Sequence, residues 1–173
     1  MKTLLTALIV SCASAASAQP LTGTFPSIDG GTHRIEDWRG QPILVVNTAS
    51  LCGFTKQYDD LQTLHEEYAD AGLVVLAVPS NDFRQELASE DEVKDFCEVN
   101  FGLTLPMTTI TSVRGAEAHP FYRQLEEVAG FVPAWNFDKV LIGPEGTVVE
   151  TWRSITRPTA PVIIETIDAL LAD

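Results

Sequence analysis

Two unbroken apolar runs with a helical segment between them constrain the fold of this chain more than any other feature. Residues 43–46 (ILVV) and 73–78 (LVVLAV) have the composition of strands that are buried on both faces of a sheet. Between them, Tyr58, Leu61 and Leu64 recur at helical spacing. A strand, a helix and a strand over this length form a βαβ unit, so the two strands are predicted to be parallel.

Four further signals surround this unit, and together they are typical of a small α/β domain. They are a turn at residues 29–31 (DGG), a helix start at Ser89 to Glu92, a hairpin turn at residues 143–146 (GPEG) and a terminal helix from about Pro161. The terminal helix is expected to bury a stripe made of Ile164, Ile167 and Leu171. A βαβ unit followed by a β-hairpin and a terminal helix is the thioredoxin-like plan, with a central mixed sheet flanked by helices.

Cys52 lies directly after the first buried run and before the helical segment. A thiol there faces backbone N–H groups and the positive end of the helix dipole, which stabilise its thiolate form. Thiol–disulfide oxidoreductases of this fold carry a second cysteine three residues further on, but Thr55 occupies that position here. The chemistry must therefore use one nucleophile, and attack on a peroxide O–O bond to give a sulfenic acid suits it. A small buried cysteine without reactivity is the alternative from position alone.

Four segments, in order along the chain, resemble the glutathione peroxidase family. Residues 46–55 (VNTASLCGFT) resemble the segment around the family's catalytic cysteine or selenocysteine, and residues 78–86 (VPSNDFRQE) resemble its second segment. Residues 95–102 (DFCEVNFG) resemble the helix end that carries a resolving cysteine in some members, and residues 135–137 (WNF) resemble the third active-site segment. The similarity spans about residues 22–172. It implies a thioredoxin-like peroxidase that reduces hydrogen peroxide and organic hydroperoxides in defence against oxidative stress.

The resemblance implies a role for each of these residues. Cys52 is the peroxide-reducing nucleophile, while Trp135 and Asn136 each have an N–H donor suited to its thiolate or to the departing oxyanion. The alternative for Trp135 is packing in the core. Cys97 is expected to resolve the sulfenic acid by forming a disulfide, unless it is a buried apolar residue of its helix. No cofactor or metal is implied, and the reductant is a thioredoxin-like dithiol protein or glutathione.

One position departs from the family's pattern. The family usually has a glutamine where Asp82 stands, and an ionised aspartate cannot donate a hydrogen bond and would disfavour the thiolate. The segment is also one residue shorter than usual, so Gln85 is a candidate for the same role. A third alternative is that Asp82 points away and the site works with two donors. The sequence leaves these alternatives open.

The N-terminus has the pattern of an export signal. A positive start, an apolar run and a small-residue cleavage site (ASA) occur in that order within residues 1–18. We therefore predict a signal peptide at residues 1–18, a thioredoxin-like peroxidase domain at residues 19–173, and a mature protein in the periplasm or outside the cell. The alternative is a membrane-anchored lipoprotein, because the segment that ends at Cys12 (IVSC) resembles a lipoprotein signal.

Charge and length narrow the set of partners. The chain has 24 Asp and Glu residues against 11 Lys and Arg, for a formal net charge of −13. Such a surface repels phosphate backbones and anionic lipid heads, so no nucleic-acid or membrane-surface partner is expected. Twelve residues separate Tyr122 from Trp135, which leaves no room for the insertion that tetrameric family members use, so we expect a monomer.

Two other functions are compatible with the same fold. One is an exported thiol–disulfide oxidoreductase, against which the absence of a second cysteine near Cys52 argues. The other is a non-catalytic binding module in which Cys52 and Cys97 form a structural disulfide.

Overall fold

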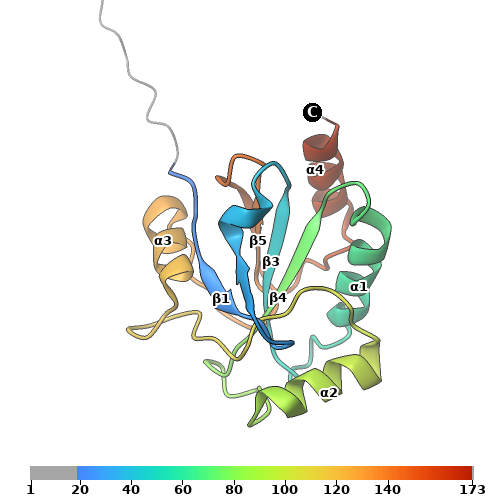
Figure 1. Ribbon diagram of the computed structural model, residues 1–173, viewed down its shortest axis with the longest axis vertical. Helices are drawn as coiled ribbons and strands as arrows, with labels where there is room; N and C mark the ends of the chain where they lie inside the picture. The colour runs from blue at the N-terminus through green and yellow to red at the C-terminus, as the bar shows by residue number, and fades with distance from the viewer. Residues whose placement is uncertain (1–18, 173) are drawn as a thin grey trace, which may run out of the picture.

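The computed structural model describes residues 19–172, so the predicted signal peptide at residues 1–18 lies outside the described part of the chain (Figure 1). Eleven elements follow one another in this part. They are β1 (Thr24–Pro26), β2 (Thr32–Arg34), the 3-10 helix η1 (Ile35–Trp38), β3 (Ile43–Thr48), α1 (Gln57–Tyr68), β4 (Val74–Pro79), α2 (Glu90–Phe101), α3 (Pro120–Ala129), β5 (Lys139–Ile142), β6 (Val148–Trp152) and α4 (Pro161–Leu171).

The central sheet has four strands in the order β4-β3-β5-β6. Strand β3 pairs with β4 in parallel, from Ile43 opposite Val74 to Thr48 opposite Pro79, and it pairs with β5 in the antiparallel sense. All six residues of β3 are buried, as its unbroken apolar start predicts for a strand covered on both faces. The α/β, thioredoxin-like prediction with a mixed sheet is confirmed.

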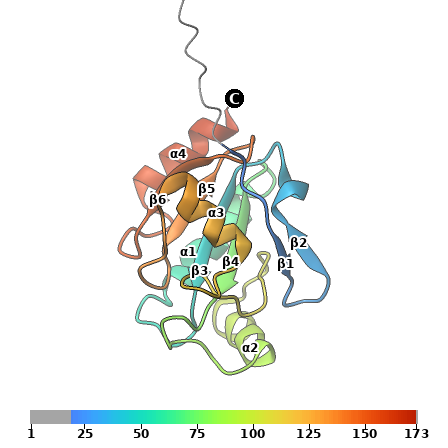
Figure 2. The same ribbon diagram turned by 90° about the vertical axis from the view of Figure 1, so that its left-hand side faces the viewer.

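Helices α1 and α4 cover one face of this sheet, and α3 covers the other (Figures 1 and 2). The side chains of β3 alternate between the two layers: Leu44 and Val46 join the core under α1 and α4, while Ile43 and Val45 join the core under α3. Each fully buried aliphatic side chain of this kind stabilises the fold by about 1.5–3 kcal/mol. A hairpin of β1 and β2 adds Phe25 to the α3 side.

Helix α2 lies at the end of the sheet where the loop after β3 also emerges (Figure 1). Its predicted capping box is present: the Glu92 N–H donates to Ser89 Oγ (3.4 Å), and the Ser89 N–H donates to the Glu92 carboxylate (3.2 Å). The helix ends at Gly102, whose φ of 60° is the left-handed conformation that glycine adopts readily. Val93 and Cys97 of this helix are buried, and the partly buried Phe96 and Phe101 pack against the same core.

The structure corrects the prediction for α4. This helix buries Ile163 and Ile167, whereas Ile164 and Leu171 are only partly buried at the edge of the same core. The buried stripe of α4 is centred on Ile163 and Ile167 instead of Ile164, Ile167 and Leu171. Both sets have helical spacing and share Ile167, so packing against the sheet determines which one is buried. Within residues 19–172, no helix combines the length and hydrophobicity that spanning a membrane requires.

Candidate active site

Cys52 lies in the loop between β3 and α1, and its side chain is buried with 5% exposure. The chain does not enter the helix directly after Cys52, as the sequence suggested, because α1 begins five residues later at Gln57. Consecutive turns fill the gap: the Thr55 N–H donates to the Cys52 carbonyl oxygen (3.2 Å), and the Tyr58 N–H donates to that of Thr55 (2.9 Å). Cys52 therefore lies inside a tight turn that precedes the helix.

Two residues of the segment between β4 and α2 hold the backbone just before Cys52. The Leu51 N–H donates to the Gln85 carbonyl oxygen (2.8 Å), and the Ser50 N–H donates to the carboxylate of Glu86 (2.9 Å). The position of the Cys52 turn therefore depends directly on residues 85 and 86.

Asn136, in the loop before β5, contacts Gln85, one of the two residues that hold the backbone before Cys52. It is fully buried, and its side-chain amide donates to Gln85 Oε1 (2.9 Å). Asn47, in β3, holds this loop from both sides, because its side chain donates to the Trp135 carbonyl oxygen (3.0 Å) and its own carbonyl accepts from the Phe137 N–H (2.5 Å). Phe137 has a φ of 64°, which is strained for a bulky residue by about 1–3 kcal/mol. The loop is therefore kept in an unusual shape that presents Asn136 to Gln85.

Trp135 is 42% exposed, which does not fit the alternative of packing in the core. Its ring lies 5.4 Å from that of Phe83, centroid to centroid. Together with Phe54 and Ile155 it lines an open groove of about 460 Å³. Because Phe54 is two residues from Cys52, the groove lies beside the cysteine turn.

The structure places Asp82 away from this cluster. Its carboxylate accepts hydrogen bonds from the Val113 N–H (2.6 Å), the Arg114 N–H (3.1 Å) and the Ser112 hydroxyl (3.3 Å). The charge of Asp82 thus fixes the loop before α3, and the amide of Gln85 is the one that meets Asn136. Asp82 therefore points away from Asn136, and Gln85 is the residue of this segment whose side chain contacts it.

Cys97 is buried in α2 and, like Cys52, is a free thiol in this structure. Burial raises the pKa of the Cys97 thiol to about 12, although the nearby Tyr58 hydroxyl lowers it. In this state Cys97 is packed on its helix face, and no disulfide joins it to Cys52.

A buried lysine supports the site, and the sequence analysis did not identify it. Lys139 is fully buried at the start of β5, and its Nζ donates to Gln57 Oε1 (2.5 Å) and to the Thr156 carbonyl oxygen (2.6 Å). Burial lowers the pKa of Lys139 to about 8. The lysine therefore joins the loop of Asn136 to the first residue of α1, in the chain that follows the Cys52 turn. A charged residue at the start of an apolar strand was the available signal.

Asp138, next to Lys139 in the sequence, also holds the Trp135 loop in place. It is almost fully buried and accepts from the Ala134 N–H (2.8 Å) and from the Ser154 N–H (2.8 Å). It also forms an ion pair with Arg153 at 2.7 Å. These contacts join the Trp135 loop to the chain after β6.

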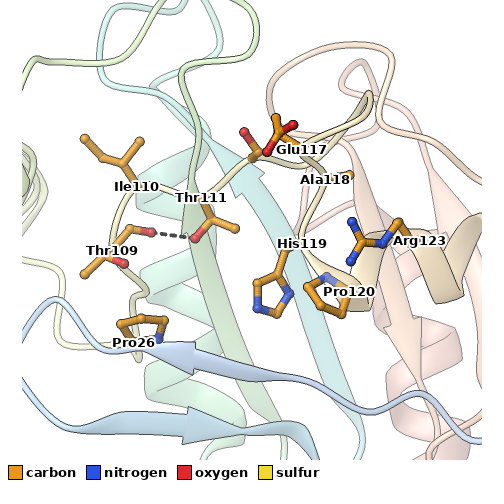
Figure 3. Close-up of a pocket in the computed structure, with 10 residues that line it drawn as sticks. Pro26, Thr109, Ile110, Thr111, Glu117, Ala118, His119, Pro120 and Arg123 are labelled. Atoms are coloured by element: carbon orange, nitrogen blue, oxygen red, sulfur yellow. Dashed lines mark hydrogen bonds between the residues drawn. The ribbon is translucent and has the colours of Figure 1, made fainter.

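A second hollow, of about 380 Å³, lies between the loop before α3 and strand β1 (Figure 3). His119 faces it, but its ring is already engaged: Nε2 donates to the Thr24 carbonyl oxygen (3.1 Å), and Nδ1 accepts from the Phe121 N–H (3.3 Å). The ring also stacks on Phe25 with a centroid separation of 4.1 Å. His119 is therefore a packing residue that begins α3. Across residues 19–172, no three His, Cys, Asp or Glu side chains gather in an arrangement that could hold a metal ion.

Fold and site together define a class of protein. The sheet is thioredoxin-like, the cysteine follows its central strand, and Thr55 stands where a dithiol site would need the second cysteine. Two side-chain amides meet beside this turn. The class is that of thioredoxin-fold thiol enzymes with a single cysteine at the principal site.

Comparison with known proteins identifies the family. A family model described as glutathione peroxidase matches residues 22–126. The glutathione peroxidase of Lactococcus lactis is 41% identical over 136 residues, which span 76% of this chain and 87% of that protein. The thioredoxin/glutathione peroxidase BtuE of Escherichia coli is 33% identical over 177 residues, spanning 88% of this chain and 97% of that protein. The crystal structure of Trgpx in its apo form matches with a TM-score of 0.66 at 32% identity, covering 87% of this chain and 93% of that one.

The chain belongs to the glutathione peroxidase family, and its activity is the thiol-dependent reduction of hydroperoxides.

Proposed function

We propose that Cys52 is the nucleophile of this peroxidase and that Gln85, Asn136 and Trp135 stabilise the charge that develops around its sulfur. The Cys52 thiolate attacks the terminal oxygen of the hydroperoxide, an S–O bond forms and the O–O bond breaks. Water or an alcohol leaves after taking up a proton. The observation that supports this most is the hydrogen bond between Asn136 and Gln85, beside the turn that holds Cys52.

The orientation of Gln85 suits this role. Its side-chain oxygen accepts from Asn136, so the N–H₂ end of the same amide is turned the other way and is available as a donor. A prearranged N–H donor aimed at a developing oxyanion is worth roughly 10²–10³ in rate in other enzymes. Gln85 is therefore proposed to take the place of the glutamine that the family usually has at position 82.

Cys97 is proposed to resolve the Cys52 sulfenic acid by forming a disulfide with it. A disulfide needs Cα atoms within about 7 Å, and we propose that the buried Cys97 leaves its packed position in α2 to meet Cys52. The helix packs on the body through the buried Val93 and Cys97 and the partly buried Phe96 and Phe101, and we propose that local opening of its C-terminal part releases Cys97. A disulfide product is in turn a substrate for a thioredoxin-like dithiol, in keeping with the name of the Escherichia coli relative, thioredoxin/glutathione peroxidase BtuE.

Export to the periplasm or outside the cell is proposed from the signal pattern of residues 1–18. The folded domain begins close behind the predicted cleavage site: Leu21 is fully buried, and its N–H donates to the Gly146 carbonyl oxygen (2.8 Å). Intact mass of the secreted protein should give a chain that starts at Gln19. A mass that includes Cys12 with a diacylglycerol group would instead establish the lipoprotein.

The mature protein is proposed to act as a monomer, because the connection between α3 and β5 runs only from residue 130 to residue 138. Sedimentation at micromolar concentration should give the mass of a single chain. A concentration-independent dimer or tetramer would contradict this.

The catalytic roles are tested by peroxide consumption with Cys52→Ser and Cys97→Ser variants, using thioredoxin or glutathione as reductant. Cys52→Ser should consume no peroxide, because a serine hydroxyl is far less ionised and less nucleophilic than a thiol. Cys97→Ser should consume one equivalent and then stall with thioredoxin. Full turnover by the Cys52 variant would mean that another residue is the nucleophile, and full thioredoxin turnover by the Cys97 variant would remove its resolving role.

A further inference from the structure

Glu86 is a buried carboxyl group that the reaction described so far does not use. It is 7% exposed, and one of its two carboxylate oxygens, Oε1, accepts from the Ser50 N–H and from the Leu87 N–H, each at 2.9 Å. The other oxygen, Oε2, is buried and has no hydrogen-bond partner in the described part of the chain. A single oxygen atom of Glu86 therefore joins the backbone before Cys52 to the backbone after Gln85.

This link lies beside a second one between the same two segments. The Leu51 N–H donates to the Gln85 carbonyl oxygen (2.8 Å), so two successive residues on one side are bonded to two successive residues on the other. One hydrogen bond would leave the segments free to pivot about it, whereas two neighbouring bonds also fix their relative orientation. The side chain of Glu86 therefore completes the joint between the Cys52 turn and the segment that carries Gln85.

The turn before Gln85 explains why Glu86 is directed toward this joint. The Arg84 N–H donates to the Asn81 carbonyl oxygen (2.9 Å), and Arg84 has a φ of 57°, in the left-handed region that is uncommon for residues other than glycine. The Asn81 side-chain oxygen accepts from the Glu86 N–H (3.3 Å), so Asn81 holds both ends of the turn. As a result, Asp82 bonds the loop before α3, while Gln85 and Glu86 bond the loop after β3.

The peroxide step depends on how far the Gln85 amide lies from the Cys52 sulfur. A donor stabilises developing charge only within hydrogen-bond reach, and a misplacement of about 1 Å can cost roughly 100-fold in rate. The two side chains come from separate loops, so their separation is set by the contacts that join the loops. The hydrogen bonds at Ser50 and Leu51 are such contacts, and Glu86 supplies the side-chain acceptor among them.

We propose that Glu86 is a positioning residue for the peroxide step, whose Oε1 atom sets the separation between the Cys52 sulfur and the Gln85 amide. This rests on the proposed roles of Cys52 and Gln85. Both backbone donors converge on one oxygen, so the role requires an acceptor atom at this place and needs neither the negative charge nor the second oxygen. Glu86 acts through the backbone of Ser50 and Leu87 and takes no part in making or breaking bonds.

Two substitutions separate the position of this oxygen from its charge. Glu86→Gln keeps an oxygen at the same distance from the backbone but removes the charge. Glu86→Asp keeps the charge but draws the oxygen back by one C–C bond, about 1.5 Å. In stopped-flow oxidation of Cys52 by hydrogen peroxide, Glu86→Gln should react within about threefold of the wild-type rate, and Glu86→Asp should react roughly 10- to 100-fold more slowly.

Asp82 provides the matched control within the same segment. Its carboxylate also accepts from two backbone N–H groups, those of Val113 and Arg114, but in the loop before α3. Asp82→Ala should therefore leave the rate of Cys52 oxidation within about threefold of wild type. A loss of rate as large as that in Glu86→Asp would mean that any disturbance of this segment slows the reaction, and it would overturn a specific role for Glu86.

A double-mutant cycle distinguishes positioning of Gln85 from general support of the fold. In a Gln85→Ala background the donor is already absent, so adding Glu86→Asp should slow the peroxide step by less than about threefold further. A general loosening of the site would instead multiply the two losses and contradict the proposal. If Glu86→Asp does not fold, Asn81→Ala, which removes the acceptor of the Glu86 N–H, takes its place in the cycle, with at least threefold slowing expected only where Gln85 is present.

The proposal is overturned if Glu86→Asp oxidises at the wild-type rate. It is equally overturned if Glu86→Gln is slowed as much as Glu86→Asp, since the charge would then matter and not the position of the oxygen. Failure of the proposed function gives a different result, because Gln85→Ala alone would then react with hydrogen peroxide at the wild-type rate.

Discussion

Replacing the buried Lys139 by methionine should change how the stability of this protein depends on pH. The pKa of Lys139 is lowered from 10.5 to about 8 by burial in the folded state. Between these two values the unfolded chain binds a Lys139 proton that the folded chain has released, so the contribution of Lys139 to the free energy of unfolding rises as pH rises. The contribution of Lys139 to the free energy of unfolding rises by at most about 1.4 kcal/mol per pH unit, which amounts to about 1–2 kcal/mol between pH 8 and pH 9.5.

Urea unfolding at several pH values in this window measures the effect directly. The free energy of unfolding of wild type, minus that of Lys139→Met, should rise by about 1–2 kcal/mol across this window, because the variant has no proton to release. Lys56→Met, which removes an exposed lysine near the start of α1, should follow the wild-type pH dependence. Cys97 acts in the opposite sense, because the unfolded chain loses its thiol proton near pH 9 while burial keeps it in the folded chain, but this contribution is common to all three proteins and cancels in the difference.

The reasoning would be refuted if wild type and Lys139→Met had the same pH dependence between pH 8 and pH 9.5. Lys139 would then stay charged throughout, and its contacts with Gln57 and Thr156 would be strong enough to offset its removal from water.

Three other outcomes are expected. Asn136→Ala and Gln85→Ala should each slow the oxidation of Cys52 by hydrogen peroxide by roughly 10- to 1,000-fold in stopped-flow measurements, because each removes an amide from the cluster beside the sulfur. Asp82→Asn should change that rate by less than about threefold, but should lower the free energy of unfolding by about 1–3 kcal/mol, because the carboxylate accepts from the backbone of the loop before α3. In native protein at pH 8, iodoacetamide should modify Cys97 at least roughly tenfold more slowly than in the urea-unfolded chain, measured by peptide mass spectrometry, because burial suppresses its thiolate.

The parts of the fold that the sequence predicts well are those with a strong local signal. The unbroken apolar runs of β3 and β4 could hardly be anything but buried strands, and the Ser89–Glu92 capping box marks the start of α2. Helix α3 was not predicted, because it is short and buries only three side chains between charged ones. Its one clear signal was the proline at its first position, which is favoured there.

The site was predictable in its chemistry but not in its geometry. Cys52, Trp135 and Asn136 are predicted as site residues because their residue types in that order suit peroxide reduction. The choice between Asp82 and Gln85 depends on how a shortened loop turns, and no local pattern determines that. Lys139 was missed because a lysine in a strand is usually at the surface, and only the carbonyl and amide acceptors that surround it here make its burial tolerable.

The loop between β4 and α2 affects how relatives of this protein should be compared. The amide that meets Asn136 comes from position 85, three residues after the place where the family usually has its glutamine. A comparison made column by column pairs Asp82 with that glutamine and scores the site as damaged, although an amide from position 85 contacts Asn136. Relatives with an acidic residue in this column are better judged by whether some nearby amide reaches the asparagine of the WNF segment. In this chain the two amides meet through the shape of the loop, so a contact between side chains is a better criterion for such a site than a position in the sequence.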